Sequence, residues 1–279
     1  MRVILKQVHK SFTHKGQRLQ VLHDVNFSIE EGEFICVIGP SGCGKSTLIS
    51  LIAGLEFPDT GKVFVDSKVV EGPSPDRLVV FQEAALFPWL TVLENVEFGL
   101  KIAGVPQEER HARAFEAIKM VHLSRFVNAH PHQLSGGMKH RAAIARALVM
   151  DPKILLMDEP FAALDAQTRQ MLQEELQEIW QKTKKTILFV THNVREATFL
   201  SDRVFEITAR PGTIKHEYPI LIGRPRHEQD PALLTIQTKI MGSLKNEIEK
   251  VAKEQLDMDY QLSKARGVSP IERNMGSHI

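Results

Sequence analysis

Residues 34–46 read FICVIGPSGCGKS, a short apolar run followed at once by a glycine-rich segment that ends in lysine and serine. The apolar run, Phe34–Ile38, predicts a strand buried on both faces, as strands of parallel sheets are. The segment after it matches G-x-x-x-x-G-K-[ST], and residues 45–55 can form a helix. A buried strand, a glycine-rich turn and a helix in this order predict an α/β fold with a phosphate site at the helix N-terminus.

The residue types of the glycine-rich segment suit the phosphates of a nucleotide. Glycines let consecutive backbone N–H groups turn inward around an anion, and the helix dipole adds positive charge. Lys45 is expected to reach the β- and γ-phosphates, and the Ser46 hydroxyl to bind Mg²⁺. The alternative, a chance glycine-rich turn, does not explain the strand and helix on either side. The predicted nucleotide-binding residues are Gly39, Pro40, Ser41, Gly42, Cys43, Gly44, Lys45, Ser46 and Thr47.

A second apolar strand, residues 154–157, ends in two acidic residues. Such a strand would hold Asp158 rigidly near a metal ion, with Glu159 one residue beyond it and near an attacking water. Acidic residues often follow strands, so the pattern alone fits a solvent-exposed loop equally well. Combined with the phosphate-binding segment, it predicts an enzyme that hydrolyses ATP or GTP.

Residues 134–138 read LSGGM and precede a predicted helix over 139–150. A serine and two glycines at a helix N-terminus form a second candidate anion site, although an ordinary helix cap uses the same residues. One chain does not need two sites for a γ-phosphate unless each copy completes the site of another copy. The segment is therefore consistent with two copies that share their nucleotide sites.

The rest of the chain predicts an α/β unit that is interrupted by helices and then resumes. Thr91 can cap a helix through residue 99, Pro106 can start another, and a further helix is expected over 166–182. Strands are expected at residues 3–8, 62–65, 78–81, 153–157, 186–190 and 204–207.

A C-terminal helix is predicted after Asp230 and Pro231, a good N-cap and first-turn pair. Its apolar stripe consists of Ile236, Ile240, Leu244, Ile248 and Val251. The stripe is expected either to pack on the core or to make a regulatory or dimer contact. Residues 261–279 show no periodicity and are expected to fray.

Composition excludes several protein classes. The chain has 279 residues, 43% of them hydrophobic, with 35 Lys and Arg against 34 Asp and Glu. This balance gives no reason to expect a nucleic-acid partner. The chain has no apolar run long enough to span a bilayer and no secretory leader, so we expect a cytosolic enzyme or binding protein. His130 and His132 flank a proline, and without four convergent ligands they do not predict a zinc site.

Taken together, the motifs resemble the ATP-binding subunit of an ABC transporter over roughly residues 1–225. The match runs in order through GPSGCGKS (39–46), VFQE (80–83), LSGGM (134–138), DE (158–159), ALD (163–165) and VTH (190–192). Met138 is a departure, because the family most often has Gln there. The resemblance implies a P-loop, RecA-like α/β core with an N-terminal antiparallel β subdomain and an inserted helical subdomain over about 88–150. Residues 226–279 would form a helical tail.

The resemblance also assigns catalytic roles. It implies that Glu159 is the general base or water-orienting carboxylate, and that His192 bridges the γ-phosphate and the opposite subunit. Gln82 would sense Mg²⁺ and water while contacting the membrane partner. The implied catalytic residues are Glu159, His192, Gln82 and Lys45, and the implied Mg²⁺ ligands are Ser46, Gln82 and Asp158.

Other residues are assigned to nucleotide contacts. By resemblance, Ser135, Gly136 and Gly137 would grip the γ-phosphate bound to the other subunit, and Asp165 would link the two sites. Phe12 resembles the aromatic residue that stacks on adenine, although a single Phe in such a stretch is often a core residue. The implied cofactors are ATP and Mg²⁺.

Local similarities indicate which group of transporters is involved. Residues 86–92, 161–165 and 224–226 are similar to the ATPases of nitrate, sulfonate and taurine importers. This similarity implies a homodimer on the cytoplasmic face of a bacterial membrane, with separate permease subunits and, indirectly, a periplasmic or lipoprotein solute-binding protein. The sequence does not identify the solute, which we expect to be a small anion or sulfonate.

Two other functions are alternatives. An ABC ATPase that acts without a permease on nucleic acid or ribosomes usually has two cassettes or a long coiled coil, and this chain has neither. An interaction subunit with a degenerate site is disfavoured by the intact Lys45, Asp158, Glu159 and His192.

Overall fold

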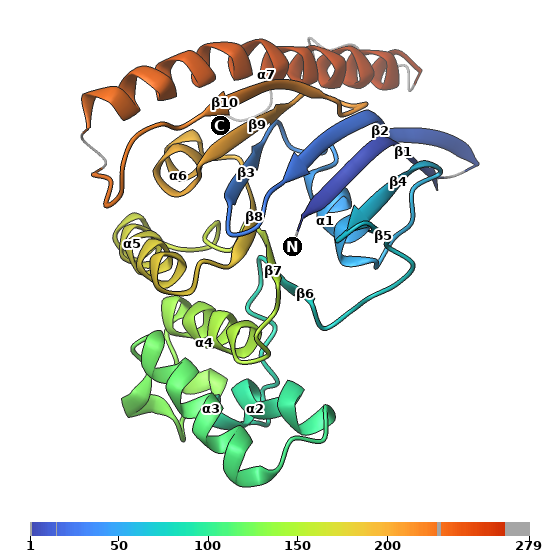
Figure 1. Ribbon diagram of the computed structural model, residues 1–279. Coiled ribbons are helices and arrows are strands. Elements are labelled where there is room, and N and C mark those ends of the chain that lie inside the picture. The colour runs from blue at the N-terminus through green and yellow to red at the C-terminus, as the bar shows by residue number, and fades with distance from the viewer. Residues whose placement is uncertain (1, 15, 228–229, 266–279) are drawn as a thin grey trace, which may run out of the picture.

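The computed structural model describes residues 2–14, 16–227 and 230–265. Its centre is a six-stranded sheet whose inner strands are parallel (Figure 1). In spatial order the strands are β10 (Ile214–Pro219), β9 (Arg203–Ile207), β3 (Phe34–Ile38), β8 (Thr186–Thr191), β7 (Ile154–Asp158) and β6 (Arg77–Val80). Every residue of β3 is buried, which confirms the strand predicted from the apolar run. The glycine-rich turn, the Asp158–Glu159 pair and His192 therefore lie at the ends of three interior strands, β3, β7 and β8.

A second sheet is antiparallel and lies beside the first (Figure 1). Its order is β2 (Gln17–Ile29), β1 (Val3–His14), β4 (Thr60–Val65) and β5 (Lys68–Val69). Helix α1 (Lys45–Ala53) contributes Leu48 and Ile52 to one apolar cluster that also holds residues of both sheets. This shared core fixes the start of α1, where the phosphate-binding segment ends, against the two sheets.

The predicted helical insertion is confirmed. It contains α2 (Val92–Ile102), α3 (Gln107–Met120), the short 3₁₀ helices η1 (Ser124–Phe126) and η2 (Pro131–Gln133), and α4 (Gly136–Leu148). Thr91 caps α2 as predicted, because its side chain accepts from the Glu94 N–H and the Glu94 carboxylate bonds back. The helix α4 begins at Gly136, three residues earlier than predicted, since Ser135 caps it.

Helices α5 (Ala166–Thr183) and α6 (Val194–Leu200) connect the later strands. The bounds of α5 agree with the prediction, but α6 and the edge strand β10 were missed. The helix α6 is seven residues long and buried at most positions, so it has no readable amphipathic stripe. The sequence of β10 is mostly polar and ends in proline, as suits an edge strand.

The helix α7 (Pro231–Ala265) runs along the outside of the molecule, past β10 and α6 (Figure 1). Of the predicted stripe, Ile240 and Leu244 are buried, whereas Ile248 is half exposed. Leu233, which was not in the predicted stripe, is fully buried. The helix thus packs on the core. It continues to residue 265, a few residues past the point near 261 from which fraying or disorder is expected. Residues 266–279 lie outside the described residues.

Buried charges hold α7 against the sheet. The Glu247 carboxylate accepts from the Ala209 N–H at 3.0 Å and lies 3.0 Å from the Lys215 ammonium. Lys215 also pairs with Glu206, which is completely buried and accepts from the Tyr218 hydroxyl at 2.7 Å. The hydrogen bonds and charge around Glu247 lower the pKa of its carboxyl to about 2. Burial, together with the hydrogen bond to Glu206, raises the pKa of the Tyr218 hydroxyl to about 12. The tail helix is therefore docked by charge as well as by apolar packing.

Glu247→Gln is expected to lower the stability of the protein in a pH-dependent way. The folded pKa of about 2 lies below the ordinary value of 4.5, so the charge stabilises the fold above pH 4.5 and this contribution is lost toward pH 2. The variant should be less stable at pH 7 by roughly 2–3 kcal/mol, with the difference vanishing near pH 2. Urea unfolding at several pH values measures this. The exposed Glu249→Gln serves as control, and equal losses in both variants would contradict the account.

No helix among the described residues is long and apolar enough to cross a membrane.

Candidate nucleotide-binding and catalytic site

A cavity of about 400 Å³ lies where the glycine-rich turn meets the ends of β7 and the antiparallel sheet. It brings together residues from four separate parts of the predicted site and adds Val21, a β2 residue that the sequence analysis missed. The side chains and backbone that line it belong to Phe12, Val21, Ser41, Gly42, Gly44, Lys45, Ser46, Thr47, Gln82, Asp158 and Glu159. Gly39, Pro40 and Cys43, also predicted, do not line the cavity.

Glycine is required at two points of the turn. Gly44 has φ +106°, and a Cβ there would lie 2.6 Å from Leu22 Cδ2. A Cβ at Gly39 would lie 2.3 Å from Ile207 Cγ2. The turn therefore packs closely against β2 and β9, and Gly44 lines the cavity at this point. Cys43 is buried in the core beneath it, and burial raises the pKa of its thiol. This backbone cradle at a helix start suits phosphate.

Lys45 provides a buried positive charge at the cradle. Only 6% of the residue is exposed, and its ammonium donates to the carbonyls of Gly39 and Pro40 at 2.9 and 3.0 Å. Its Nζ also lies 3.9 Å from Glu159 Oε1. The buried ammonium thus has two neutral acceptors at hydrogen-bond distance and an ion-pair partner at 3.9 Å, so it can still bind a phosphate group.

Asp158 ends β7 beside Ser46. Burial raises the pKa of the Asp158 carboxyl, although a hydrogen bond from Ser46 and the Lys45 charge act in the opposite direction. The oxygens of Asp158, Ser46 and Gln82 are the hard donors that Mg²⁺ takes. Among the described residues, no three His, Cys, Asp or Glu side chains are close enough to hold a metal. The few oxygen donors of this set fit Mg²⁺, which usually takes one or two carboxylates and completes its coordination with phosphate oxygens and water.

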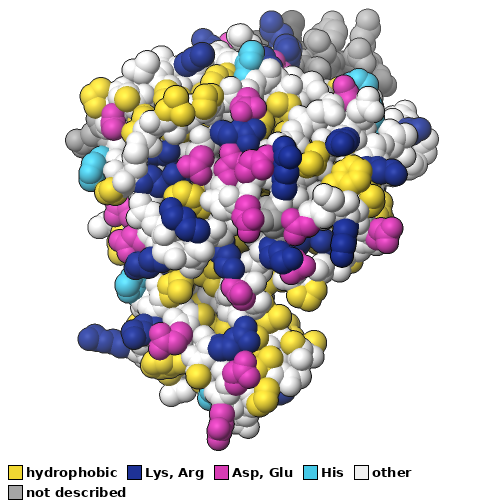
Figure 2. Space-filling view, in the orientation of Figure 1, with side chains coloured by type: hydrophobic (Ala, Val, Ile, Leu, Met, Phe, Trp, Pro, Cys, Tyr) yellow, Lys and Arg dark blue, Asp and Glu magenta, His cyan; other side chains and the backbone are white. Residues whose placement is uncertain are grey.

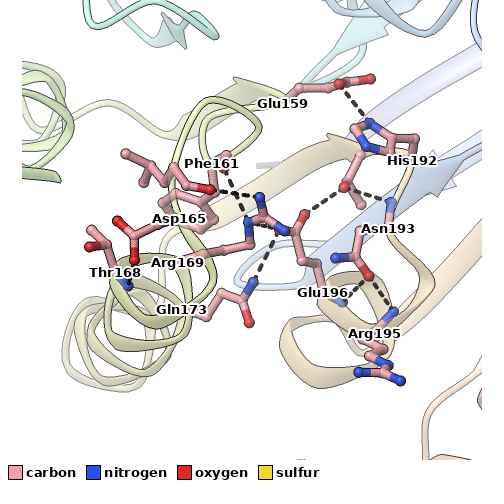
Figure 3. A network of polar contacts seen from close by, with 12 residues as sticks. Glu159, Phe161, Asp165, Thr168, Arg169, Gln173, His192, Asn193, Arg195 and Glu196 are labelled. Atoms are coloured by element: carbon pink, nitrogen blue, oxygen red, sulfur yellow. Dashed lines mark hydrogen bonds and ion pairs between the residues drawn. The ribbon is translucent and has the colours of Figure 1, made fainter. Parts of the chain in front are cut away.

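Glu159 and His192 face each other across the ends of β7 and β8 (Figure 3). Glu159 Oε2 lies 2.9 Å from His192 Nδ1, and the other carboxylate oxygen faces Lys45. The backbone of Glu159 has φ +45°, an uncommon value for this residue type, and its N–H donates to the Val190 carbonyl. This turn aims the carboxylate at the cavity, where it can accept a proton from water.

The pair adjoins a polar network that the sequence analysis missed (Figure 3). Glu196, buried at the start of α6, accepts from the Thr191 hydroxyl at 2.5 Å and from the Gln173 amide at 3.1 Å. Arg169 Nε lies 3.6 Å from the same carboxylate. Burial raises the pKa of Glu196. These residues are spread over α5, β8 and α6, so no local motif joins them.

Comparison with known proteins identifies the family. The family model described as ABC transporter matches residues 22–162. An uncharacterised ABC transporter ATP-binding protein of Methanocaldococcus jannaschii is 54% identical over 255 residues, which cover 91% of this chain and 96% of that protein. The chain belongs to the ABC transporter family.

The names of other relatives specify the solute that is imported. A nitrate import ATP-binding protein of Synechocystis is 47% identical to this ABC protein, over 86% of this chain and 89% of the relative. An aliphatic sulfonates import ATP-binding protein of Bacillus thuringiensis is 42% identical, over 86% and 95%. The dimeric structure of an ATP-binding cassette with ADP and Pi superposes with a TM-score of 0.69 at 36% identity, covering 79% of this chain and all of that one. The chain is thus an ATP-binding and ATP-hydrolysing subunit with the cassette fold.

The LSGGM segment of this ABC subunit lies outside the 400 Å³ cavity. Ser135 caps α4 by accepting from the Met138 N–H at 3.3 Å, and Asp165 caps α5 by accepting from the Thr168 N–H at 2.9 Å. A Cβ at Gly137 would lie 2.6 Å from Thr168 Cγ2, so the starts of α4 and α5 pack closely. The four residues predicted for contacts in trans, Ser135, Gly136, Gly137 and Asp165, therefore lie on these two neighbouring helix starts.

Phe12, on β1, lines the nucleotide cavity. The residue is 38% exposed, and Lys10 Nζ lies 4.9 Å from the ring centroid. A partly exposed ring at the mouth of the cavity suits stacking on a nucleotide base better than it suits a core position.

Proposed function

We propose that two copies of this chain hold two ATP molecules with Mg²⁺ between the glycine-rich turn of one copy and the LSGGM segment of the other. One observation carries this proposal: Ser135 and Gly137 lie outside the cavity that contains Lys45 and Glu159. A second copy supplies these missing contacts without any change in the fold. The relative with ADP and Pi is dimeric, which supports the same arrangement.

The residues of the cavity have different functions in ATP hydrolysis. Lys45 and the backbone of the turn bind phosphate, and Ser46, Asp158 and Gln82 hold Mg²⁺, which would neutralise charge on the transferred group. Glu159 takes a proton from the attacking water, and His192, 2.9 Å away, keeps the Glu159 carboxylate in position. His192 also bridges the γ-phosphate and the opposite subunit. Phe12 stacks on adenine. In the other copy, Ser135, Gly136, Gly137 and Asp165 complete the site.

The dimer of two copies is proposed to drive uptake of a small anion or sulfonate through a separate permease. Residues 1–225 would form the cassette, with 226–279 as an appendage, and the pair would lie on the cytoplasmic face of a bacterial membrane. The similarity to nitrate and sulfonate import proteins supports this function. The test is uptake of labelled nitrate, alkanesulfonate or taurine by cells that express this chain with its permease and binding protein. Uptake that is independent of the chain would contradict the proposal.

The loop between β6 and α2 is the proposed contact with the permease. It begins near Gln82 and presents Trp89, which is 70% exposed and packs against Phe87. Asn95, which is buried, fixes this loop by donating to the carbonyls of Phe87, Leu90 and Thr91. A rigid loop with an exposed aromatic residue at its tip, connected to a Mg²⁺ ligand, suits a contact that reports on the site.

Trp89→Ala is expected to weaken copurification of the permease by about tenfold or more, because truncation of a central aromatic contact typically costs about 2 kcal/mol. The ATPase rate of the isolated chain should stay unchanged, since Trp89 does not line the cavity. Phe57→Ala is the control, as Phe57 is 51% exposed but lies before β4. Equal recovery of the permease with Trp89→Ala and with the wild type would refute this contact.

The alternative, an ABC ATPase that acts on nucleic acid, is disfavoured by the surface. On the face drawn in Figure 2, Lys and Arg side chains are interspersed with Asp and Glu. This face therefore has no continuous stripe of positive charge along which nucleic acid could bind. The net charge of the chain is +1. Tight binding of DNA or RNA that weakens steeply with salt would favour the alternative.

A further inference from the structure

One buried carboxylate connects two loops of the site. Glu196 is only 5% exposed. Its Oε2 accepts from the hydroxyl of Thr191, the residue directly before His192, at 2.5 Å. Its Oε1 accepts from the Gln173 amide at 3.1 Å and lies 3.6 Å from Arg169 Nε (Figure 3). The carboxylate thus reaches from the loop that carries His192 to the helix α5.

Arg169 extends this connection to the turn before α5. Its Nη2 donates to the Leu164 carbonyl at 2.8 Å, and its Nε donates to the Phe161 carbonyl at 3.3 Å. Both carbonyls belong to the turn that begins after Glu159 and ends at Asp165. The planar guanidinium therefore holds this turn at two points while it faces Glu196.

The network lies directly behind the catalytic pair. A small cavity of about 10 Å³, close to the volume that one water molecule needs, separates the two groups. Its walls include Glu159 and His192 on one side and Arg169 and Glu196 on the other. Neither Arg169 nor Glu196 lines the nucleotide cavity. A change in the network would therefore alter the position of catalytic groups without removing a contact to ATP.

The connection is rigid because the buried groups satisfy one another. A carboxylate inside a protein needs donors, and Glu196 has the Thr191 hydroxyl, the Gln173 amide and the Arg169 charge. Loss of one partner leaves a buried charge incompletely paired, so the network has few alternative arrangements. Movement of one loop is thereby linked to movement of the other.

We propose that Arg169 and Glu196 are positioning residues that join the Asp165 turn and the His192 loop into one unit. The contact that Asp165 makes to the other copy and the contact that His192 makes within its own site then form together. This links the two ATP sites. The inference rests on the functions proposed above for Asp165 and His192.

The test compares Arg169→Gln and Glu196→Gln with the wild type in steady-state ATP hydrolysis. Each should lower kcat by about tenfold to a hundredfold, as displacement of catalytic groups by about 1 Å does, while ATP affinity stays within about twofold. The double variant should lose no more than the more impaired single variant, because both act through one contact.

The ion pair of Arg203 and Glu33 provides the matched control. It is also partly buried, with 3.0 Å between Nη1 and Oε1, but it lies at the other end of the central strands. Arg203→Gln and Glu33→Gln should change kcat by less than about twofold despite a similar loss of thermal stability. If Glu196→Gln does not fold, Thr191→Val is the second variant. It removes the hydroxyl that donates to Glu196 and accepts from the Asn193 N–H, and it should lower kcat in the same way.

Three results would overturn the inference. They are a kcat near wild type in a folded Arg169→Gln or Glu196→Gln variant, losses that multiply in the double variant, and an equal loss in the control pair. If Glu159→Gln is inactive while Glu196→Gln is normal, only this inference fails. If Glu159→Gln itself hydrolyses ATP at the wild-type rate, the proposed catalytic roles fail and the inference fails with them.

Discussion

Glu159→Gln is expected to lower kcat for ATP hydrolysis by about 10²–10⁴-fold, the usual contribution of a general base. The amide keeps the size of the side chain and its reach to His192 Nδ1, now 2.9 Å from Glu159 Oε2, but it cannot accept a proton from water. Affinity for ATP should persist, because Lys45 and the glycine-rich turn are intact. Phosphate release at saturating ATP and equilibrium binding of ATP measure the two quantities separately.

The control for this variant is Glu109→Gln on the surface of α3, where the exposed carboxylate lies 3.4 Å from Arg113 Nη1. It should hydrolyse ATP at the wild-type rate. Hydrolysis at that rate by Glu159→Gln would show that another group, or none, acts as the base.

Lys45→Met should lower ATP affinity by about 10- to 100-fold, because it removes a charge-assisted contact worth about 1.5–3 kcal/mol. The methionine has a similar length and fits the buried position, so stability should be retained. Lys45 Nζ is 3.9 Å from Glu159 Oε1, and without the ammonium charge the phosphates would lie near this carboxylate with only the uncharged donors of the turn to bind them. Titration with a fluorescent ATP analogue measures the affinity.

Lys6→Met, an exposed residue on β1, is the matched control and should bind ATP normally. Unaltered affinity in Lys45→Met would mean that the phosphates do not bind at the start of α1.

Much of the fold could be predicted from local patterns. The strand Phe34–Ile38 and the turn after it depend on neighbouring residues, so the sequence shows them directly. The Thr91 cap of α2 and the bounds of α5 follow from equally short signals. Lys45, Ser46, Asp158 and Glu159 were predicted for the same reason and line one cavity.

The missed features depend on contacts that are distant along the chain. The Glu196 carboxylate meets Arg169 and Gln173 from another helix, and no spacing in the sequence indicates that meeting. The strand β10 is polar because it lies at an edge, and α6 is too short to show a stripe. The position of α7 likewise depends on charges such as Lys215 and Glu247, which a search for apolar periodicity passes over.

The central claim is that two copies share two ATP molecules. The most direct test is the molar mass of the Glu159→Gln variant, measured in the presence of ATP. Light scattering after gel filtration, combined with a count of bound nucleotide, should show a dimer of the 31.5-kDa chain with two ATP, and a monomer without ATP. Gly137→Ala in the same background should prevent the dimer, since its Cβ would displace Thr168 beside the LSGGM segment. A Glu159→Gln protein that binds ATP and remains a monomer would contradict the claim.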